Sequence, residues 1–545
     1  MRTKTLLAGL FLTVVLAVRA SSQTVSANLE AGSEACSICQ SEIYGSYRKT
    51  AMARASGFAG DGLIASEFSH KQSGVLYRVY EHDGRAWMSY ERKSESEFRG
   101  QRELLYFIGS GRKGRSYLFS VQGFLFETPI NWYSQEYRWN MAPAYTEARE
   151  IPMNLPSFVD CLNCHTSGLQ PRVPGTDSRF FGKPFLHGGI TCERCHGLGE
   201  GHLEGKGTIV NPAKLSPERR DSICMQCHFE GTVAVEQLGK HLYQFQPGDR
   251  LSEYIHYFLL IRNQPQTTQA LSQFEALSLS MCRRKSGDKM SCMSCHDPHK
   301  EPSGEERTAY YRSKCLTCHG EKFAARHHPG KPDCVQCHMP MMSSIDVAHT
   351  QSTDHRILRY PYAPQLPTPS MVPRLVSFPE RETSQANIRD FALAWETLAQ
   401  RDIEGASQKA EQYLRKAVNE RPDDTVLLSA LGFIEQEHGR EKEARELYER
   451  ALKLDPLAND AATNLGALEA RSGNLRRAVE LWQGAFDRVP HRSAMGMNLA
   501  IAFCAAGQKE EARRYVLRVL DFNPDFTIAK RLLAHLNADP VKCTP

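Results

Sequence analysis

The chain has 545 residues, of which 41% are hydrophobic and 24% charged, and its formal net charge is +5. These shares are typical of a globular protein and exclude a collagen-like, coiled-coil or largely disordered chain. The length exceeds what one hydrophobic core organises, so we expect several domains. The nearly balanced charge argues against nucleic acid as a partner.

Residues 1–20 have the pattern of a secretory signal peptide. Arg2 and Lys4 precede an apolar run that ends at Val18, and Ala20 offers a small residue for cleavage. The alternative, a membrane anchor, needs roughly 20 apolar residues, which is longer than this run. We expect an exported bacterial protein, periplasmic or on the outer surface, with no transmembrane segment after cleavage and a formal charge of +2.

Residues 72–139 show the period-two alternation of β-strands. Val75–Val79, Ala86–Tyr90 and Ser116–Phe119 alternate in this way, and His82-Asp83-Gly84 between the first two is typical of a tight turn. We predict a small antiparallel β insertion, whose aromatic side chains form its own core rather than cofactor contacts.

The sequence Cys-x-x-Cys-His occurs six times within residues 161–338 and uses twelve of the seventeen cysteines. Two thiols three residues apart on a helical turn reach the two vinyl groups of a haem, and the following His then lies beneath the iron. Structural zinc is the alternative. A zinc site would require the motifs to pair, and it would not require a His directly after the second Cys of each motif. We therefore predict six covalent c-type haems. The attachment residues are Cys161, Cys164, Cys192, Cys195, Cys224, Cys227, Cys292, Cys295, Cys315, Cys318, Cys334 and Cys337, and the proximal iron ligands are His165, His196, His228, His296, His319 and His338.

The motifs are too closely spaced for a separate core around each haem. The haems must then stack against one another and replace an aliphatic interior, with short helices and loops around them. Close approach of cofactors is also what electron transfer requires.

Six further donors are needed if every iron has two axial ligands. His299 lies three residues beyond His296, so it can reach a neighbouring haem more easily than its own. The other candidates follow the last motif, flank the second motif in a glycine-rich stretch, or lie in the N-terminal segment. The alternative for each is an ordinary hydrogen-bonded histidine. The predicted distal ligands are His70, His187, His202, His299, His349 and His355; His327, His328, Met339 and Met341 are held in reserve, and His82, His241 and His256 are interpreted as ordinary side chains.

Several segments follow a shared pattern along nearly the whole mature chain. They are Cys36-Ser-Ile-Cys39, Ile43-Tyr44, Ser46-Tyr47, Ile108-Gly-Ser-Gly111, Arg115-Ser-Tyr117, Trp132-Tyr133, Cys192-Glu-Arg-Cys195-His196-Gly197, Asn211-Pro-Ala-Lys214, Cys292-Met-Ser-Cys295-His296-Asp-Pro-His299, Cys337-His-Met-Pro340 and Thr353-Asp-His355-Arg-Ile357. Through these segments, the chain resembles a bacterial family of multihaem cytochromes with C-terminal tetratricopeptide repeats, which is related to the cytochrome c-552/4 and doubled-CxxCH groups. The resemblance implies electron transfer in the periplasm or at the outer surface.

Gln40 departs from this family pattern, which places a His after Cys39. A seventh haem attached through Cys36 and Cys39 would lack its usual proximal ligand. Three interpretations stay open: a disulfide or free dithiol without haem, a weakly ligated haem, or a zinc or other site. An open iron position is where small-molecule chemistry would occur.

From about residue 391 the chain repeats every 34 residues, which is the period of tetratricopeptide helix pairs. Gly provides the turn within a pair, Ala lets the helices approach, and Pro ends each repeat. Bulky residues share one register as a stacking core, and we expect a closing helix at Thr527–Leu536. The repeating positions are Pro422, Pro456, Pro490 and Pro524; Gly439, Gly473 and Gly507; Ala410, Ala444, Ala478 and Ala512; and Leu414, Tyr448, Trp482 and Val516.

The array has no catalytic constellation, so we interpret it as a docking module for a protein or peptide; a purely stabilising role is the alternative. Cys504 is interpreted as a buried small apolar residue, whereas Cys282 and Cys543 have no assignment. The proline-rich stretch Pro361–Arg381 indicates a linker.

The predicted fold class is mainly α, with a multihaem cytochrome c domain of short helices and loops around stacked haems, a small antiparallel β insertion and a tetratricopeptide α-solenoid. The expected divisions are a signal peptide at 1–20, a cytochrome domain at 21–360, a linker at 361–385 and a repeat domain at 386–545. The favoured function is electron relay between redox partner proteins, rather than an enzyme. The alternatives are a haem-dependent reductase of a small oxidised nitrogen or sulfur compound, and a scaffold that haems stabilise.

Overall fold

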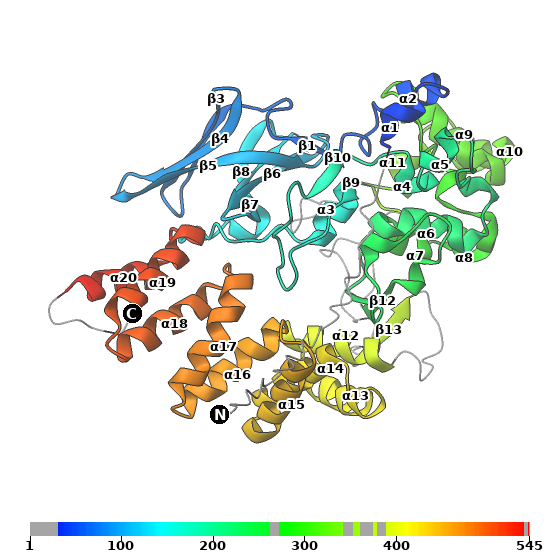
Figure 1. Cartoon of the computed structure of the whole chain (residues 1–545). Coiled ribbons are helices and arrows are strands. Elements are labelled where there is room, and N and C mark those ends of the chain that lie inside the picture. Colours follow the sequence, from blue (N-terminus) through cyan, green and yellow to red (C-terminus); the bar gives the residue numbers. More distant parts are fainter. Residues whose placement is uncertain are drawn as a thin grey trace, which may run out of the picture.

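The computed structural model describes residues 31–134, 136–261, 272–341, 353–359, 374–378, 388–538 and 543. Figure 1 shows an antiparallel sheet, a group of short helices that carries the Cys-x-x-Cys-His motifs, and an arc of paired helices. The predicted signal peptide and the predicted ligand His349 lie outside the described residues. None of the described helices is long and apolar enough to cross a membrane.

An eight-stranded antiparallel sheet follows two short N-terminal helices, α1 (Ser33–Cys36) and α2 (Ser41–Tyr47). Its strands have the order β2-β3-β4-β5-β6-β7-β8, and β1 pairs beside β5. Asp83 and Gly84 adopt positive φ values of 51° and 70°, as a tight hairpin turn between β3 and β4 requires. The strands are β1 (Ser56–Phe58), β2 (Ser66–His70), β3 (Val75–His82), β4 (Arg85–Arg92), β5 (Glu95–Ile108), β6 (Gly114–Val121), β7 (Phe124–Tyr133) and β8 (Arg138–Met141).

The sheet extends beyond the predicted insertion at 72–139, so the predicted mainly α fold class is only partly right. The predicted strands and turn are confirmed, but β1 and β2 lie before the insertion and contain no alternating hydrophobic run. β7 buries eight of its ten residues, and this pattern hides the period-two signal. Its Leu125 packs with Leu118 of β6, Leu162 and Phe185, whereas Phe126 belongs to the core on the other face of the sheet. The sheet therefore supports the motif region directly.

Five of the six motifs end a short helix at their histidine. The fourth motif instead lies in a 3₁₀ turn at Cys292–Ser294. The elements of this motif region are α3 (Val159–His165), β9 (Thr166–Leu169), β10 (Phe185–Gly188), α4 (Glu193–His196), α5 (Glu200–Leu203), α6 (Pro217–His228), α7 (Gln273–Leu279), α8 (Met281–Ser286), α9 (Arg307–His319), α10 (Glu321–His327) and α11 (Cys334–His338).

A three-stranded sheet connects the motif region to the helical array. It contains β11 (Val233–Glu236), β12 (Ile255–Ile261) and β13 (Arg374–Phe378) in that order. Phe258 and Leu375 share one hydrophobic core with the first array helix. The described part of the predicted linker is therefore a β-strand.

The array consists of antiparallel helix pairs in the predicted 34-residue period, and the closing helix is present. Gly439, Gly473 and Gly507 have φ values of 75°, 84° and 75° at the turns within the pairs. The repeated alanines and the bulky residues in register with them are buried. The helices are α12 (Ile388–Gln400), α13 (Ala406–Glu420), α14 (Thr425–Glu437), α15 (Glu441–Leu454), α16 (Asn459–Arg471), α17 (Leu475–Arg488), α18 (Ser493–Ala505), α19 (Lys509–Phe522) and α20 (Thr527–Asn537).

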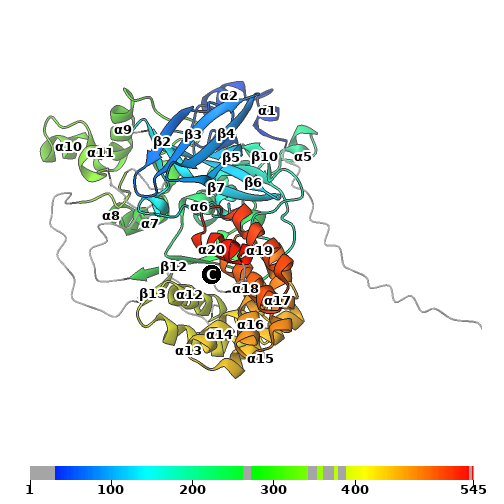
Figure 2. The ribbon, with the colours of Figure 1, turned by 90° about the vertical axis from the view of Figure 1, so that its left-hand side faces the viewer.

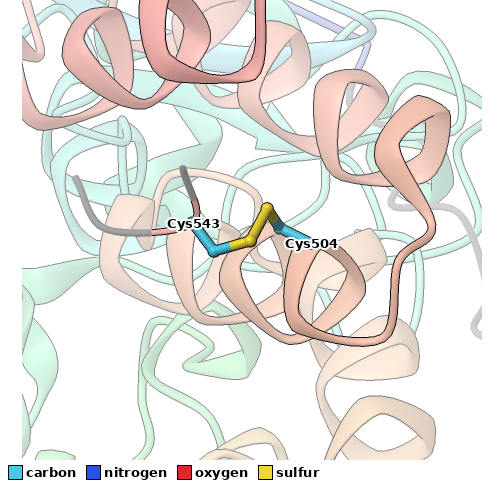
Figure 3. The surroundings of a disulfide bond; sticks show 2 residues. All are labelled: Cys504 and Cys543. Atoms are coloured by element: carbon cyan, nitrogen blue, oxygen red, sulfur yellow. A yellow bond between two sulfur atoms is a disulfide. The ribbon is translucent and has the colours of Figure 1, made fainter. Parts of the chain in front are cut away.

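A disulfide joins Cys504 of α18 to Cys543 beyond the last helix (Figure 3). Cys504 is buried as predicted, but the interpretation as a small apolar residue missed this bond. The reason is that Cys543 lies outside the repeat period, so the sequence pattern did not place it against α18.

The array contacts the rest of the chain at both ends and in the middle, and Figure 2 shows it beneath the sheet and the motif region. At its first helix, the Asp390 carboxylate accepts a hydrogen bond of 2.6 Å from Gln237. In the middle, Asn459 Nδ2 donates to the Gly175 carbonyl at 2.7 Å. In the turn before its last helix, Asp525 forms an ion pair with Arg92 of the sheet at 2.5 Å.

Candidate cofactor site

The cysteines of neighbouring motifs lie against one another, although the motifs are separated in sequence. In the buried pair between the first and third motifs, the shared hydrogen bond lowers the pKa of Cys227 to about 6 and raises that of Cys164. The hydrogen-bonded thiol pairs are Cys164 with Cys227, Cys224 with Cys292, and Cys315 with Cys334.

Longer-range electrostatic interactions link the remaining motifs to these pairs. Cys195 of the second motif interacts with Cys227 of the third. Cys295 of the fourth motif interacts with Cys318 of the fifth. All six motifs therefore form one connected group rather than separate sites.

Four motif histidines are oriented by a hydrogen bond at Nδ1. Such a bond fixes the ring and directs Nε2 the opposite way, as ligands of a metal usually require. The contacts are His196 Nδ1 to the Val210 carbonyl at 2.8 Å, His338 Nδ1 to the Leu358 carbonyl at 2.6 Å, His228 Nδ1 to Gln273 Oε1 at 3.3 Å, and His296 Nδ1 with Tyr311 Oη at 3.4 Å.

The structure brings three motif histidines close to a second histidine. Since metal–nitrogen bonds to imidazole are about 2 Å long, two rings on opposite sides of one metal have centroids roughly 6 Å apart. The observed centroid distances lie near this separation, as expected for two axial ligands of one iron. The pairs are His196 with His299 at 5.9 Å, His296 with His355 at 6.2 Å, and His338 with His328 at 5.5 Å.

The surroundings of His296 and His299 favour the neutral imidazole, which is the form that ligates metals. The His296 residue is exposed, yet desolvation of its ring, followed by His355 and His228, lowers its pKa to about 4. Desolvation followed by the nearby His196 also lowers the pKa of His299.

His187 lies beside the first motif, although in the sequence it precedes the second. Its strand β10 pairs with β9, which begins directly after His165, and His187 faces Ser167 in the ladder. A Cβ atom on Gly32 would lie 2.8 Å from the His187 ring, so the N-terminal segment packs against this histidine only because residue 32 is glycine.

His70 is held by the sheet rather than by the motif region. It is buried at the end of β2, and both ring nitrogens are used: Nδ1 with Ser73 Oγ at 2.8 Å and Nε2 with the Thr146 carbonyl at 3.0 Å. An imidazole with both nitrogens engaged has no donor left for iron. This placement favours the ordinary structural interpretation of His70.

Of the remaining predicted or reserve ligands, His202, His327 and Met341 are exposed and Met339 is half-buried. His202 lies on α5 with Nδ1 3.3 Å from the Gly207 carbonyl. His327 packs on Phe323, which also contacts the motif residue His319. His241 and His256 bond the carboxylates of Glu236 and Asp390, each at 2.8 Å, as ordinary side chains do.

The part of the motif region at 281–341 has no hydrophobic interior of its own. None of the hydrophobic side chains in these residues is buried, and α9, α10 and α11 bury no residue at all. Close-packed interiors are the rule in folded proteins, so these helices fit a set of large apolar cofactors as their core. Within the described residues, no three Cys, His, Asp or Glu side chains gather as a metal-ion site.

Cys36 and Cys39 are both free thiols in the structure. Cys36 contacts Cys192 of the second motif, and desolvation, then this neighbour, raises its pKa to about 11. The buried Glu193 carboxylate fixes the segment by accepting backbone hydrogen bonds from Ala31 at 3.1 Å and Gly32 at 2.9 Å. The segment around Cys36 therefore packs against the second motif.

Sequence reasoning missed the groups that orient the motifs. Arg194 occupies a variable position of the second motif, but its Nη2 donates to the Asn163 carbonyl of the first motif at 3.0 Å. Tyr47 donates from its hydroxyl to the Ile190 carbonyl at 2.7 Å and meets the His299 ring edge-on. Tyr47 appeared only as part of the family pattern, and the backbone carbonyls that bind His196 and His338 leave no sequence signal.

Comparisons with known proteins match four segments of the chain. The family "Cytochrome c554 and c-prime" matches residues 133–197, the doubled CXXCH motif matches 285–324, and tetratricopeptide repeats match 426–458 and 469–536. The multiheme cytochrome MtrA of Shewanella baltica is 25% identical over 175 residues, which are 30% of this chain and 52% of MtrA. The chain thus spans about half the length of this curated relative.

Solved structures give only distant likeness. MamA of Desulfovibrio magneticus is 20% identical, with 28% of this chain and 86% of that chain covered and a TM-score of 0.25. PilF of Pseudomonas aeruginosa is 23% identical, with 28% and 69% covered and a TM-score of 0.25.

Proposed function

We propose that the chain is an exported multihaem c-type cytochrome with tetratricopeptide repeats, and that it relays electrons between redox partner proteins. In this proposal, six haems are attached through the twelve motif cysteines. Bound haem would supply one-electron chemistry, whereas the chain fixes the spacing, the axial ligands and the exclusion of water.

The connected arrangement of the six motifs carries this proposal. The first motif contacts the third through Cys164 and Cys227, and the third contacts the fourth through Cys224 and Cys292. The series continues through the fifth motif to the sixth, while the second motif joins at the third. A relay needs cofactor edges in close succession, and this connected group supplies the attachment sites for such a series.

The arrangement of histidines supports a carrier rather than an enzyme. An iron with two imidazole ligands has no open position for a substrate. Three motif histidines already have a second histidine at the separation expected across an iron.

The array supports a role in holding partners, but part of its surface is already used. Its connecting segments bind the chain's own residues, as at Asn459 and Asp525. A redox partner or peptide would therefore bind the part of the array that faces away from the sheet and motif region. The Cys504–Cys543 disulfide supports export, because such bonds persist in oxidising compartments.

A reductase of a small oxidised nitrogen or sulfur compound is the second candidate, and Gln40 is the observation that favours it. A haem attached through Cys36 and Cys39 would lie beside the second motif and lack a proximal histidine. Its iron would then have a position for substrate.

The two candidates separate in one set of measurements on the holoprotein, made in a host that attaches c-type haems. The carrier predicts six haems by intact mass, low-spin signals only and no spectral change with cyanide or nitric oxide. Seven haems, or a high-spin fraction that binds nitric oxide, would overturn the carrier and support the reductase.

A further inference from the structure

We propose that three haems take their distal ligands in a fixed, partly crossed pattern: His299 to the second-motif haem, His355 to the fourth-motif haem and His328 to the sixth-motif haem. This inference rests on the proposed haem content, and it deepens the proposed function by naming which side chain completes which iron. All three ligands lie outside the motif that they serve, and for His299 and His355 other motifs intervene in the sequence.

The pair His196 and His299 shows the crossing most clearly. Their rings are nearly parallel, with an interplanar angle of 9° and centroids 5.9 Å apart. His196 is anchored through Nδ1 to the Val210 carbonyl, and His299 Nδ1 lies 3.7 Å from Asp297 Oδ1, so the Nε2 side of each ring is left for a metal. His299 follows the fourth motif closely, yet its partner is the proximal ligand of the second.

The pair His296 and His355 completes the fourth motif from a segment beyond the last motif. Their centroids lie 6.2 Å apart, and His355 Nδ1 donates to the Thr353 carbonyl at 2.9 Å. His296 has Tyr311 Oη at its Nδ1, at 3.4 Å. Both rings are therefore oriented through Nδ1, as two axial ligands of one iron would be.

The segment 353–359 is built to hold His355 in this place. Asp354 is buried with 1% of its surface exposed, and it forms a doubly hydrogen-bonded ion pair with Arg356 at 2.7–2.9 Å. The Asp354 backbone N–H donates to the Pro340 carbonyl at 2.9 Å. This fixed geometry is unusual for a short segment and is what a pre-oriented ligand needs.

The same segment also orients the sixth motif. The Leu358 carbonyl accepts the hydrogen bond from His338 Nδ1 at 2.6 Å. His338 faces His328 at a centroid distance of 5.5 Å. One segment thus supplies a ligand to the fourth haem and fixes the proximal ligand of the sixth, which couples the ligation of two haems through the protein.

The test uses the full-length holoprotein with His299→Met, His355→Met and His328→Met made singly, and His82→Met as the control. His82 is exposed in a hairpin of the sheet, with 71% of its side chain accessible. Each of the three variants should keep six haems by intact mass, convert one low-spin bis-histidine signal to a histidine–methionine signal, and raise one reduction potential. The control should keep the parent spectrum, and a ligand variant that also keeps it would overturn that assignment.

Attachment variants then identify the haem. In a background without the second haem (Cys192→Ser with Cys195→Ser), His299→Met should give no histidine–methionine signal. In a background without the fourth haem (Cys292→Ser with Cys295→Ser), it should still give that signal, and the reverse result would overturn the crossing.

If a double cysteine background does not accumulate, the proximal variants His196→Met and His296→Met decide instead. The combination His196→Met with His299→Met should affect one haem, whereas His296→Met with His299→Met should affect two. If a ligand assignment is wrong, the haem count and the electron relay between partners stay unchanged. If the proposed relay is wrong, these ligand spectra stay unchanged. The two results are therefore distinguishable.

Discussion

The array and residues 281–341 are both built from short helices, yet they differ in what stabilises them. In the array, Ala410, Leu414 and their repeats are fully buried between neighbouring helices, which is how a solenoid shares one core. In residues 281–341 no hydrophobic side chain is buried. Both regions have regular secondary structure, so local helix formation does not tell which region has a protein core. The comparison indicates that the array can stay folded alone, whereas the motif region depends on its cofactors.

Removing the haems should have the largest effect on the structure. If the motif region stayed folded without them, the comparison between the two regions would be wrong. A chain with all twelve motif cysteines changed to serine should lose amide-exchange protection throughout 281–341. Helices α12 to α20 should stay protected, because their buried apolar contacts do not involve the motifs. Hydrogen exchange with mass spectrometry, compared with the holoprotein, measures both regions at once. Protection of 281–341 without haem would mean that the segment has a core of its own.

Breaking the contact between the sheet and the array should have the next largest effect. Asp525 is 1% exposed, pairs with Arg92 and also accepts the Ile151 N–H at 2.8 Å. Asp525→Ala leaves the Ile151 N–H without its acceptor and removes one of the carboxylates beside Arg92, which keeps its ion pair with Glu95; together this costs about 3 kcal/mol. Denaturant unfolding followed through the sheet should show the loss, while haem count and spectra stay unchanged.

A matched exposed ion pair is the control for this prediction. Glu136 pairs with Arg138 at 2.5 Å on the surface of the same sheet. Glu136→Ala should change the stability by less than about 1 kcal/mol. Equal losses in the two variants would show that the buried pair does not hold the array to the sheet.

Removing the disulfide should weaken the array alone. Cys504→Ser with Cys543→Ser frees the chain after α20, and loss of a bond with this separation of 39 residues costs about 2–4 kcal/mol. Exchange rates in α18 to α20 should rise, and those in the motif region should not. Reductant should reproduce the effect in the parent protein and have no effect on the double variant; a response of the double variant would contradict the assignment.

The regular parts of the fold were predictable because their signals are periodic. The repeat period located Gly439 and Trp482, and the alternation at Val75–Val79 located β3. Both signals arise from contacts that recur at fixed spacing, and a single sequence contains them.

The site was predictable only where covalent chemistry dictates the spacing. The Cys-x-x-Cys-His motifs are local, so the attachment residues could be proposed from sequence, and they remain predictions until haem is counted. The partner of a motif histidine depends on tertiary contacts, so the sequence ranked His70 above His328 as a candidate ligand, whereas the structure places His328 beside His338 and His70 in the sheet. His70 shows this difference well, because its bonds to Ser73 and Thr146 come from the sheet.

Glu396, whose carboxyl group is buried in the first array helix, gives the last and smallest expected effect. It tests the protein core of the array through the dependence of stability on pH. Desolvation in α12, then the nearby Asp460, raises the pKa of Glu396 from 4.5 to about 7 against the hydrogen bond from Gln400. Because the folded-state pKa is the higher one, the folded chain binds the proton more tightly. The stabilisation is fully present below pH 4.5 and is lost as the pH rises through about 7, an effect of up to ~3 kcal/mol. Glu396→Gln should remove this part of the pH dependence of exchange in α12, and the exposed Glu437→Gln should keep it. An unchanged slope in Glu396→Gln would show that Glu396 is ionised in the folded array at pH 5, and that burial in this core does not hold its proton.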